Sequence, residues 1–170
     1  MPRLASLGCF LTVVASLAGC ASSPEQEKPQ RAAASPFPDP IGRVEVRVDP
    51  SLNEEARSVA IDKMAAPGKI STAVSELLRT RGRLDANAPT TLAITITAFR
   101  LRSGASAFWL GAMAGPDRLA VDVRVEKNGA SLTQYQTDTS SVLGGIAYAG
   151  MGHRFDRLVK TIAQRIVEGL

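Results

Sequence analysis

The N-terminal stretch of the chain decides how much of it is left to fold. Residues 1–4 carry one cation, Arg3, and the run from Leu4 to Leu17 contains no charged residue. A basic residue, a short apolar run and a following site of small residues are the parts of an export signal. The apolar run has 14 residues, whereas a transmembrane helix needs about 20. We therefore expect a cleaved signal peptide rather than a membrane span.

The tetrapeptide Leu17-Ala18-Gly19-Cys20 resembles the lipobox of bacterial lipoproteins. In such proteins a diacylglyceryl group is attached to the cysteine thiol, the chain is cut before the cysteine, and the new amine is acylated. The resemblance implies a signal peptide over residues 1–19 and lipid attachment at Cys20. Three acyl chains exceed the two membrane signals that stable anchoring requires, so we expect a permanently anchored protein.

The cysteine count restricts both the core and the chemistry. Only Cys9 and Cys20 occur in the chain, and the first would leave with the signal peptide while the second would be acylated. No thiol would then remain for a disulfide, a metal or a nucleophile. The folded core would therefore have to be stable without disulfide or metal cross-links. A domain of about 130 residues can do so, because it buries roughly two-thirds of its unfolded surface.

Residues 20–40 have the composition of a tether. After Cys20 they contain five of the ten prolines and one large apolar residue, Phe37. Such a segment buries too little apolar surface to offset the entropy of ordering, so we expect a disordered tether before a single domain over 41–170. Lipoproteins held at the inner membrane typically carry Asp after the cysteine. Ala21 and Ser22 follow it here, which implies the outer membrane, with the domain on the periplasmic face.

Hydrophobic periodicity in residues 41–170 predicts an α+β fold: an antiparallel sheet of about four strands with amphipathic helices on one face. Period-two alternation indicates strands at 43–48, 91–102, 119–126 and after the turn Asn128-Gly129. Ser51 and Glu54 have capping-box spacing for a helix that extends to about Met64. A second helix over 70–81 ends at Gly82, and apolar residues recur at helical spacing along 154–168.

Two details of the strands stay open. Phe99 and Leu101 fall on the opposite side from Leu92, Ile94 and Ile96 unless a bulge near Ala98 switches the phase. Across the turn, a two-residue connection pairs Val123 with Gln134, and a three-residue connection pairs Val121 with Tyr135. We favour the second register, because it places Tyr135 on the core face.

Two segments, 103–116 and 140–152, contain no charge and are rich in Gly and Ala. Surface loops are usually polar, so these segments should be covered by something. They hold the residues of a candidate interface: Phe108, Trp109, Leu110 and Tyr148. Three possibilities remain: the segments dock on an envelope protein or on another copy, they enter the membrane as parts of an oligomeric secretion pore, or they cover the domain's own core.

The run from Thr91 to Gly145 resembles an uncharacterised family of Gram-negative lipoproteins that share a domain of unknown function. The resemblance is carried by Arg102, Gly104, the block LGAMAG at 110–115, the alternating strand from Leu119, Asn128-Gly129 and Gly144-Gly145. Its motif consists of glycines and strand periodicity. It implies an envelope lipoprotein and supplies no active-site residue.

No recognisable catalytic or cofactor-binding pattern occurs in the sequence. The only histidine is His153, which we expect to be exposed near a helix start. Gly150-Met151-Gly152 begins like a dinucleotide loop, but Phe155 stands where the third glycine belongs. Asp117, Asp122 and Asp138 lack metal-ligand spacing, and we expect them to be solvated strand charges. The sequence therefore predicts no enzyme, no metal and no cofactor, and an exported chain meets no nucleic acid.

Overall fold

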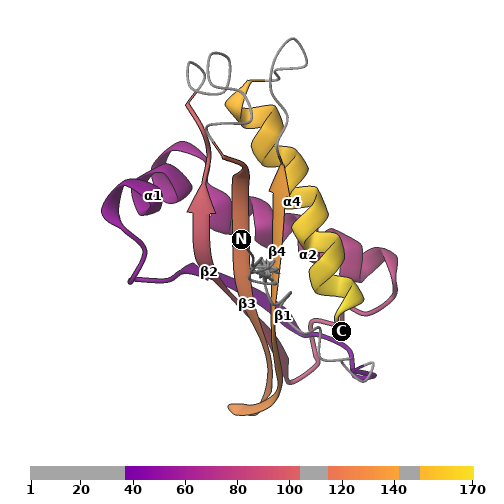
Figure 1. Ribbon diagram of the computed structural model, residues 1–170. Coiled ribbons are helices and arrows are strands. Elements are labelled where there is room, and N and C mark those ends of the chain that lie inside the picture. Colours follow the sequence, from indigo (N-terminus) through magenta and orange to yellow (C-terminus); the bar gives the residue numbers. More distant parts are fainter. Residues whose placement is uncertain (1–36, 104–114, 142–149) are drawn as a thin grey trace, which may run out of the picture. The chain divides into compact units, whose positions relative to one another are not determined.

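The computed structural model describes residues 37–103, 115–141 and 150–170. They form one four-stranded sheet in the order β1-β2-β3-β4. The strands are β1 (Arg43–Val48), β2 (Thr90–Arg100), β3 (Asp117–Lys127) and β4 (Ala130–Ser141), and the helices are α1 (Glu54–Ser58), α2 (Ala66–Thr80) and α4 (Met151–Glu168). A π-helical turn, η1 (Val59–Lys63), follows α1 directly. The arrangement is shown in Figure 1.

The α+β class is confirmed, and the sheet is mostly antiparallel. β2, β3 and β4 are antiparallel neighbours, whereas β1 pairs with β2 in parallel, with Val46 opposite Ile94. The antiparallel sheet expected from the sequence is therefore a mixed one. The reason is the connection, because α1, η1 and α2 all lie between β1 and β2 and form the long crossover that parallel strands require.

The core lies between one face of the sheet and the helices, with α2 packed on β1 and α4 on β4 and β3. Every apolar residue of the stripe expected on α4 is buried, including Phe155 and Ile162 at 0% exposure. The inward positions of β3 are equally closed to solvent: Leu119, Val121, Val123 and Val125. The sequence pattern thus identified both sides of this interface.

A β-bulge on β2 resolves the phase problem of that strand. Ile96 lies opposite Val121 and Ala98 lies opposite Ala120, so Thr97 has no residue across from it. The extra residue shifts the alternation by one position. Phe99 therefore joins the core, where its ring meets that of Phe155 with a centroid distance of 5.7 Å.

The β3–β4 hairpin follows neither expected register. Its turn has two residues, Asn128 at φ 52° and Gly129 at φ 81°, but a bulge at Leu132 then places Tyr135 opposite Val123. The preferred pairing with Val121 is wrong, although Tyr135 does lie on the core face. Its hydroxyl donates to the Ile166 carbonyl at 2.5 Å, and burial raises the pKa of this phenol.

The expected helix over 52–64 is shorter and starts differently. Asn53, not Ser51, is the N-cap, and its Oδ1 accepts from the Ala56 amide at 2.8 Å. Ser51 instead donates its backbone N–H to the Asp49 carboxylate at 2.8 Å. Hydrogen bonds from the Ser51 side chain and from this amide hold the pKa of Asp49 below its usual value. The second helix ends as expected, with Gly82 left-handed at φ 65°.

The expected signal peptide and most of the expected tether lie outside the described residues. Phe37, which falls within the tether range, packs against the core, and its amide donates to the Leu170 carbonyl. The Asp39 carboxylate forms an ion pair with Lys127 at 2.9 Å. Contacts of the domain therefore begin before residue 41.

Candidate functional site

The described residues on either side of residues 104–114 and 142–149 lie near Asp117. Segment 103–116 joins the C-terminal end of β2 to the start of β3, where Arg100 lies opposite Arg118. Segment 140–152 joins the C-terminal end of β4 to α4, and Asp117 lies opposite Ser141. The first turn of α4 meets the same point through Arg154, which donates to Asp117. The end of β2, the start of β3, the end of β4 and the start of α4 thus lie together at one end of the sheet.

Asp117 binds two buried arginines, Arg102 and Arg154, and we call these three residues the Asp117 cluster. Arg154 Nη1 donates to Asp117 Oδ2 at 2.7 Å, and Arg102 donates to Asp117 Oδ1 from its backbone amide at 2.8 Å and from Nε at 3.4 Å. Arg154 Nη2 also donates to the Arg102 carbonyl at 2.6 Å. The exposed fractions are 4% for Arg102, 0% for Asp117 and 1% for Arg154.

Burial determines what the Asp117 cluster can do chemically. A charge inside a protein is tolerated only when it is paired and hydrogen-bonded, and both carboxylate oxygens of Asp117 accept from arginine. A carboxylate closed to solvent in this way cannot reach a substrate. The cluster ties the end of β2, the start of β3 and the start of α4 together.

The expectation that Asp117 is a solvated strand charge is wrong. Its position has the same parity as Leu119 and Val121, which face the core, and it is fully buried. Arg154 precedes Leu158 by one helical turn, which puts it on the buried stripe of α4. The spacing of both residues along the sequence thus matched that of the core-facing residues and indicated burial. That signal was missed because charged residues are seldom fully buried.

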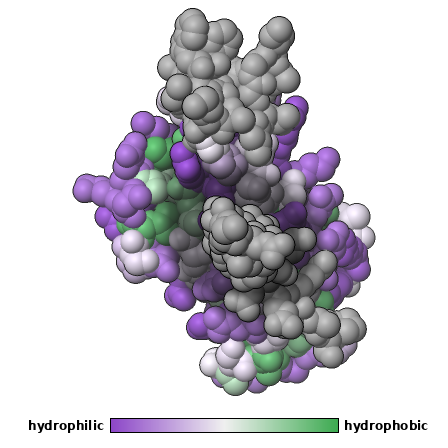
Figure 2. Space-filling view, viewed as in Figure 1, coloured by the Kyte–Doolittle hydropathy of each residue, from purple (hydrophilic) through white to green (hydrophobic). Residues whose placement is uncertain are grey.

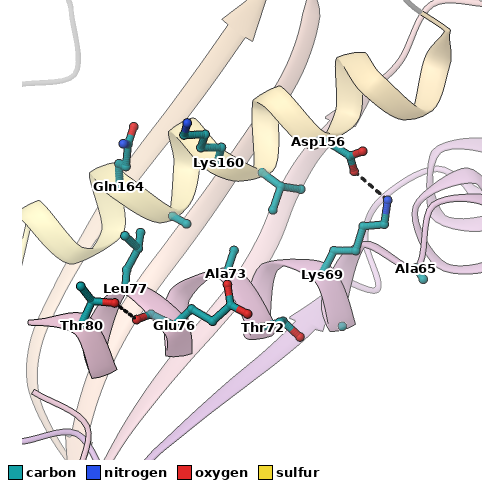
Figure 3. Close-up of a pocket in the computed structure, with 13 residues that line it drawn as sticks. Ala65, Lys69, Thr72, Ala73, Glu76, Leu77, Thr80, Asp156, Lys160 and Gln164 are labelled. Carbon is teal, nitrogen blue, oxygen red and sulfur yellow. Dashed lines mark hydrogen bonds and ion pairs between the residues drawn. The ribbon is translucent and has the colours of Figure 1, made fainter.

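A groove of about 770 Å³ runs between α2 and α4 on the side away from the sheet (Figure 3). Its inner residues are small or apolar and include Ala73, Leu77, Val159 and Ala163. At one end Lys69 Nζ meets Asp156 Oδ1 at 2.7 Å. The Lys69 ammonium also lies 5.4 Å from the centre of the Phe155 ring. The volume falls within the range of small-ligand sites, but no cluster of polar groups converges inside the groove.

Where Figure 2 colours the surface by hydropathy, most of it is hydrophilic. Hydrophobic residues gather over the α1 end and near the turn between β3 and β4 (Figure 2). The large apolar side chains exposed in the described part of the chain are Ile61 in η1, at 46%, and Leu132 in β4, at 47%. They lie on different elements, so they do not form one extended apolar patch.

The site residues expected from the sequence lie outside the part of the chain that the structure describes: Cys20, Phe108, Trp109, Leu110 and Tyr148. His153 is exposed in the first turn of α4, as expected. Within residues 37–103, 115–141 and 150–170, no three His, Cys, Asp or Glu side chains are grouped so that they could hold a metal. No helix in the same ranges is long and apolar enough to cross a membrane.

A family model described as a domain of unknown function, DUF4410, matches residues 25–145. No curated protein matches the chain.

Several solved structures resemble this one at low sequence identity. A DUF330 protein from Xanthomonas campestris is 10% identical over 79% of this chain and 88% of its own, with a TM-score of 0.49. A minor lipoprotein from Acinetobacter baumannii is 11% identical over 77% and 91%, with a TM-score of 0.43. The PelC dodecamer from Paraburkholderia phytofirmans is 14% identical over 76% and 89%, also with a TM-score of 0.43.

Proposed function

Because the chain belongs to the DUF4410 family, we propose that it is an outer-membrane lipoprotein whose periplasmic domain is a non-catalytic binding or envelope-assembly module. In this proposal residues 1–19 are the signal peptide, and acylated Cys20 with the tether to residue 40 connects the membrane to the domain over 41–170. The sequence around Cys20 and the lipoprotein resemblance support the anchor. The contacts of the described domain support the binding role.

The main support for the binding role is that the ends of β2, β3, β4 and α4 that adjoin the two charge-free segments lie together near Asp117. Ser103, Gly115, Ser141 and Gly150 are the residues of the two charge-free segments that lie next to the undescribed parts, 104–114 and 142–149. The pairing of β2, β3 and β4 and the Arg154–Asp117 hydrogen bond bring these borders to the same end of the sheet. A buried, charged cluster at that point gives the segments a common rigid base.

We propose that Phe108, Trp109, Leu110 and Tyr148 contribute to one contact surface on this base. Aromatic residues dominate binding energy at protein interfaces, and charge-free segments with aromatics are typical of contact sites. The Asp117 cluster itself supports a positioning role over a catalytic one, because Asp117 is 0% exposed and both its oxygens accept from arginine. The partner would be an envelope protein or another copy of the chain.

Changing Cys20 to Ala should leave the protein as an uncleaved precursor that incorporates no palmitate. The thiol is the acceptor of the lipid, and cleavage follows lipidation in the lipoproteins that the sequence resembles. Metabolic palmitate labelling and membrane fractionation measure the two effects, with Cys9→Ala as the matched control. A Cys20→Ala chain that is still cut and still anchored would contradict the lipoprotein assignment.

Changing Trp109 to Ala should abolish cross-linking of the domain to its envelope partner and leave its melting temperature within a few degrees of the parent. Truncating an aromatic anchor typically removes 2 kcal/mol or more of binding energy, roughly 30-fold in affinity. Leu132→Ala is the control, because Leu132 is an exposed apolar residue beside the hairpin turn, at 47%. Both variants are measured by cross-linking in intact cells and by thermal unfolding.

The same pair of variants separates the proposed function from its alternatives. A monomer in which Trp109→Ala lowers the melting temperature sharply would show that the segment covers the domain's own core. Release of a trapped dye from liposomes by the parent, lost in Trp109→Ala, would instead favour a membrane-active component. Either result would overturn the binding module.

A further inference from the structure

The groove between α2 and α4 has opposite charges on its two walls. Its four charged lining residues are Lys69 and Glu76 on α2 and Asp156 and Lys160 on α4. At one end the cation lies on α2 and the anion on α4, joined at 2.7 Å. Farther along, the anion Glu76 lies on α2 and the cation Lys160 on α4 (Figure 3). Each charged position on one wall thus has its opposite on the other wall.

A surface with this pattern is complementary to itself. The two helices run side by side in the same direction, since Lys69 contacts Asp156 near their starts and Thr80 and Gln164 line the other end (Figure 3). A two-fold axis along the groove would place α2 of one copy against α4 of the other. Glu76 would then face Lys160 of the second copy, and the same pair would recur on the other side of the axis, as an isologous interface requires.

The shape of the groove suits such a contact. On α2 it extends from Gly68 to Thr80, about 18 Å at 1.5 Å per residue. Small residues on its floor, among them Gly68, Ala73 and Ala163, allow the backbones of a second helix pair to approach closely. The half-buried side chain of Leu77 also lines the groove, and the two-fold axis would bring it close to Leu77 of the second copy.

We propose that the α2–α4 groove is the contact face of a symmetric dimer of this chain. The partner is a second copy because the charges on α2 are opposite to those on α4, so two copies of the groove pair opposite charges when they face each other. An unrelated partner would need its own surface with the complementary arrangement of charges. The inference uses a different surface from the binding module proposed above, so either can fail without the other.

Charge reversal tests the dimer on the full mature chain, purified in detergent and examined by sedimentation equilibrium. Glu76→Lys and Lys160→Glu should each raise the dimer dissociation constant about tenfold, because two attractive contacts become two repulsive ones. The double variant should return to within about twofold of the parent, since it restores opposite charges across the axis. Arg79→Glu, an exposed reversal on α2 outside the groove, should leave the constant within about twofold.

A second arm uses intact membranes, where the detergent has no influence. A chain with Thr80→Cys and a chain with Gln164→Cys are produced together, because the two-fold axis would set these two residues of different copies against each other. An intermolecular disulfide should form when both are present and at most weakly when either is produced alone.

Three results would overturn the dimer proposal. One is a monomer at every concentration together with no disulfide in membranes. Another is a dimer whose dissociation constant is unchanged by the single reversals or is not restored by the double variant. The third is a dimer that is lost in Trp109→Ala and insensitive to Glu76→Lys, which would assign self-association to the charge-free segments.

Discussion

Changing Asp117 to Asn should lower the free energy of unfolding by about 3–5 kcal/mol, the usual cost of removing one partner from a buried ion pair. The substitution keeps the size of the side chain and an oxygen for the Arg102 amide. It removes the negative charge that faces two guanidinium groups, of which Arg102 is 4% and Arg154 1% exposed. Urea unfolding of a soluble form that begins at Phe37 measures the change.

Asp138→Asn is the matched control for this prediction. Asp138 lies on the neighbouring strand and pairs with Arg118 at 3.7 Å, with side-chain exposures of 56% for Arg118 and 43% for Asp138. An exposed pair of this kind contributes at most about 1 kcal/mol. If both variants unfold at the same urea concentration, the Asp117 cluster does not hold the three element ends together. The proposed base for the two charge-free segments would then lose its support.

Ile162→Asp should destabilise the domain by several kcal/mol, which is comparable with the whole stability of a domain of this size. Ile162 is 0% exposed in the middle of the apolar stripe of α4, among neighbours such as Leu158 and Ile166 that are also buried. The buried cations of the described core, Arg102 and Arg154, already pair with Asp117, so the new carboxylate would be buried without a partner. Thermal unfolding of the same soluble form should show a large drop or no cooperative transition.

Arg157→Asp provides the comparison on the exposed side of the same helix. Substitutions at exposed positions usually change stability by no more than about 0.5 kcal/mol, and Arg157 is exposed. Equal melting temperatures for the parent and Ile162→Asp would mean that α4 does not pack on the sheet as described.

The secondary structure could be predicted where one side of an element is uniformly apolar. The bounds of β1 were identified exactly, and the buried positions of β3 and α4 followed from period two and period 3.6. In these elements the pattern along the chain directly records which side faces the core. The break in the pattern of β2 was visible too, but the sequence left a bulge near Ala98 as one of two alternatives, and the structure places the extra residue at Thr97.

Relations between distant elements were harder to predict. The parallel pairing of β1 with β2 depends on where α2 packs, and the hairpin register depends on a bulge at Leu132 that lets Tyr135 reach the end of α4. Neither leaves a local pattern, because each is chosen by the free energy of packing between segments far apart in the sequence. The N-cap of α1 differs for a related reason: Ser51 bonds to Asp49 and leaves capping to Asn53.

The sequence by itself determined the family resemblance, the α+β class and the charge-free segments with their aromatic residues. The tertiary structure alone decided that the borders of those segments converge at Asp117 and that Lys69, Glu76, Asp156 and Lys160 line one groove. The spacing of apolar residues along the sequence predicts which residues are buried, because burial repeats with the geometry of a single helix or strand. It does not record which charges meet, because Asp117 and Arg154 are brought within 2.7 Å only when β3 and α4 pack together.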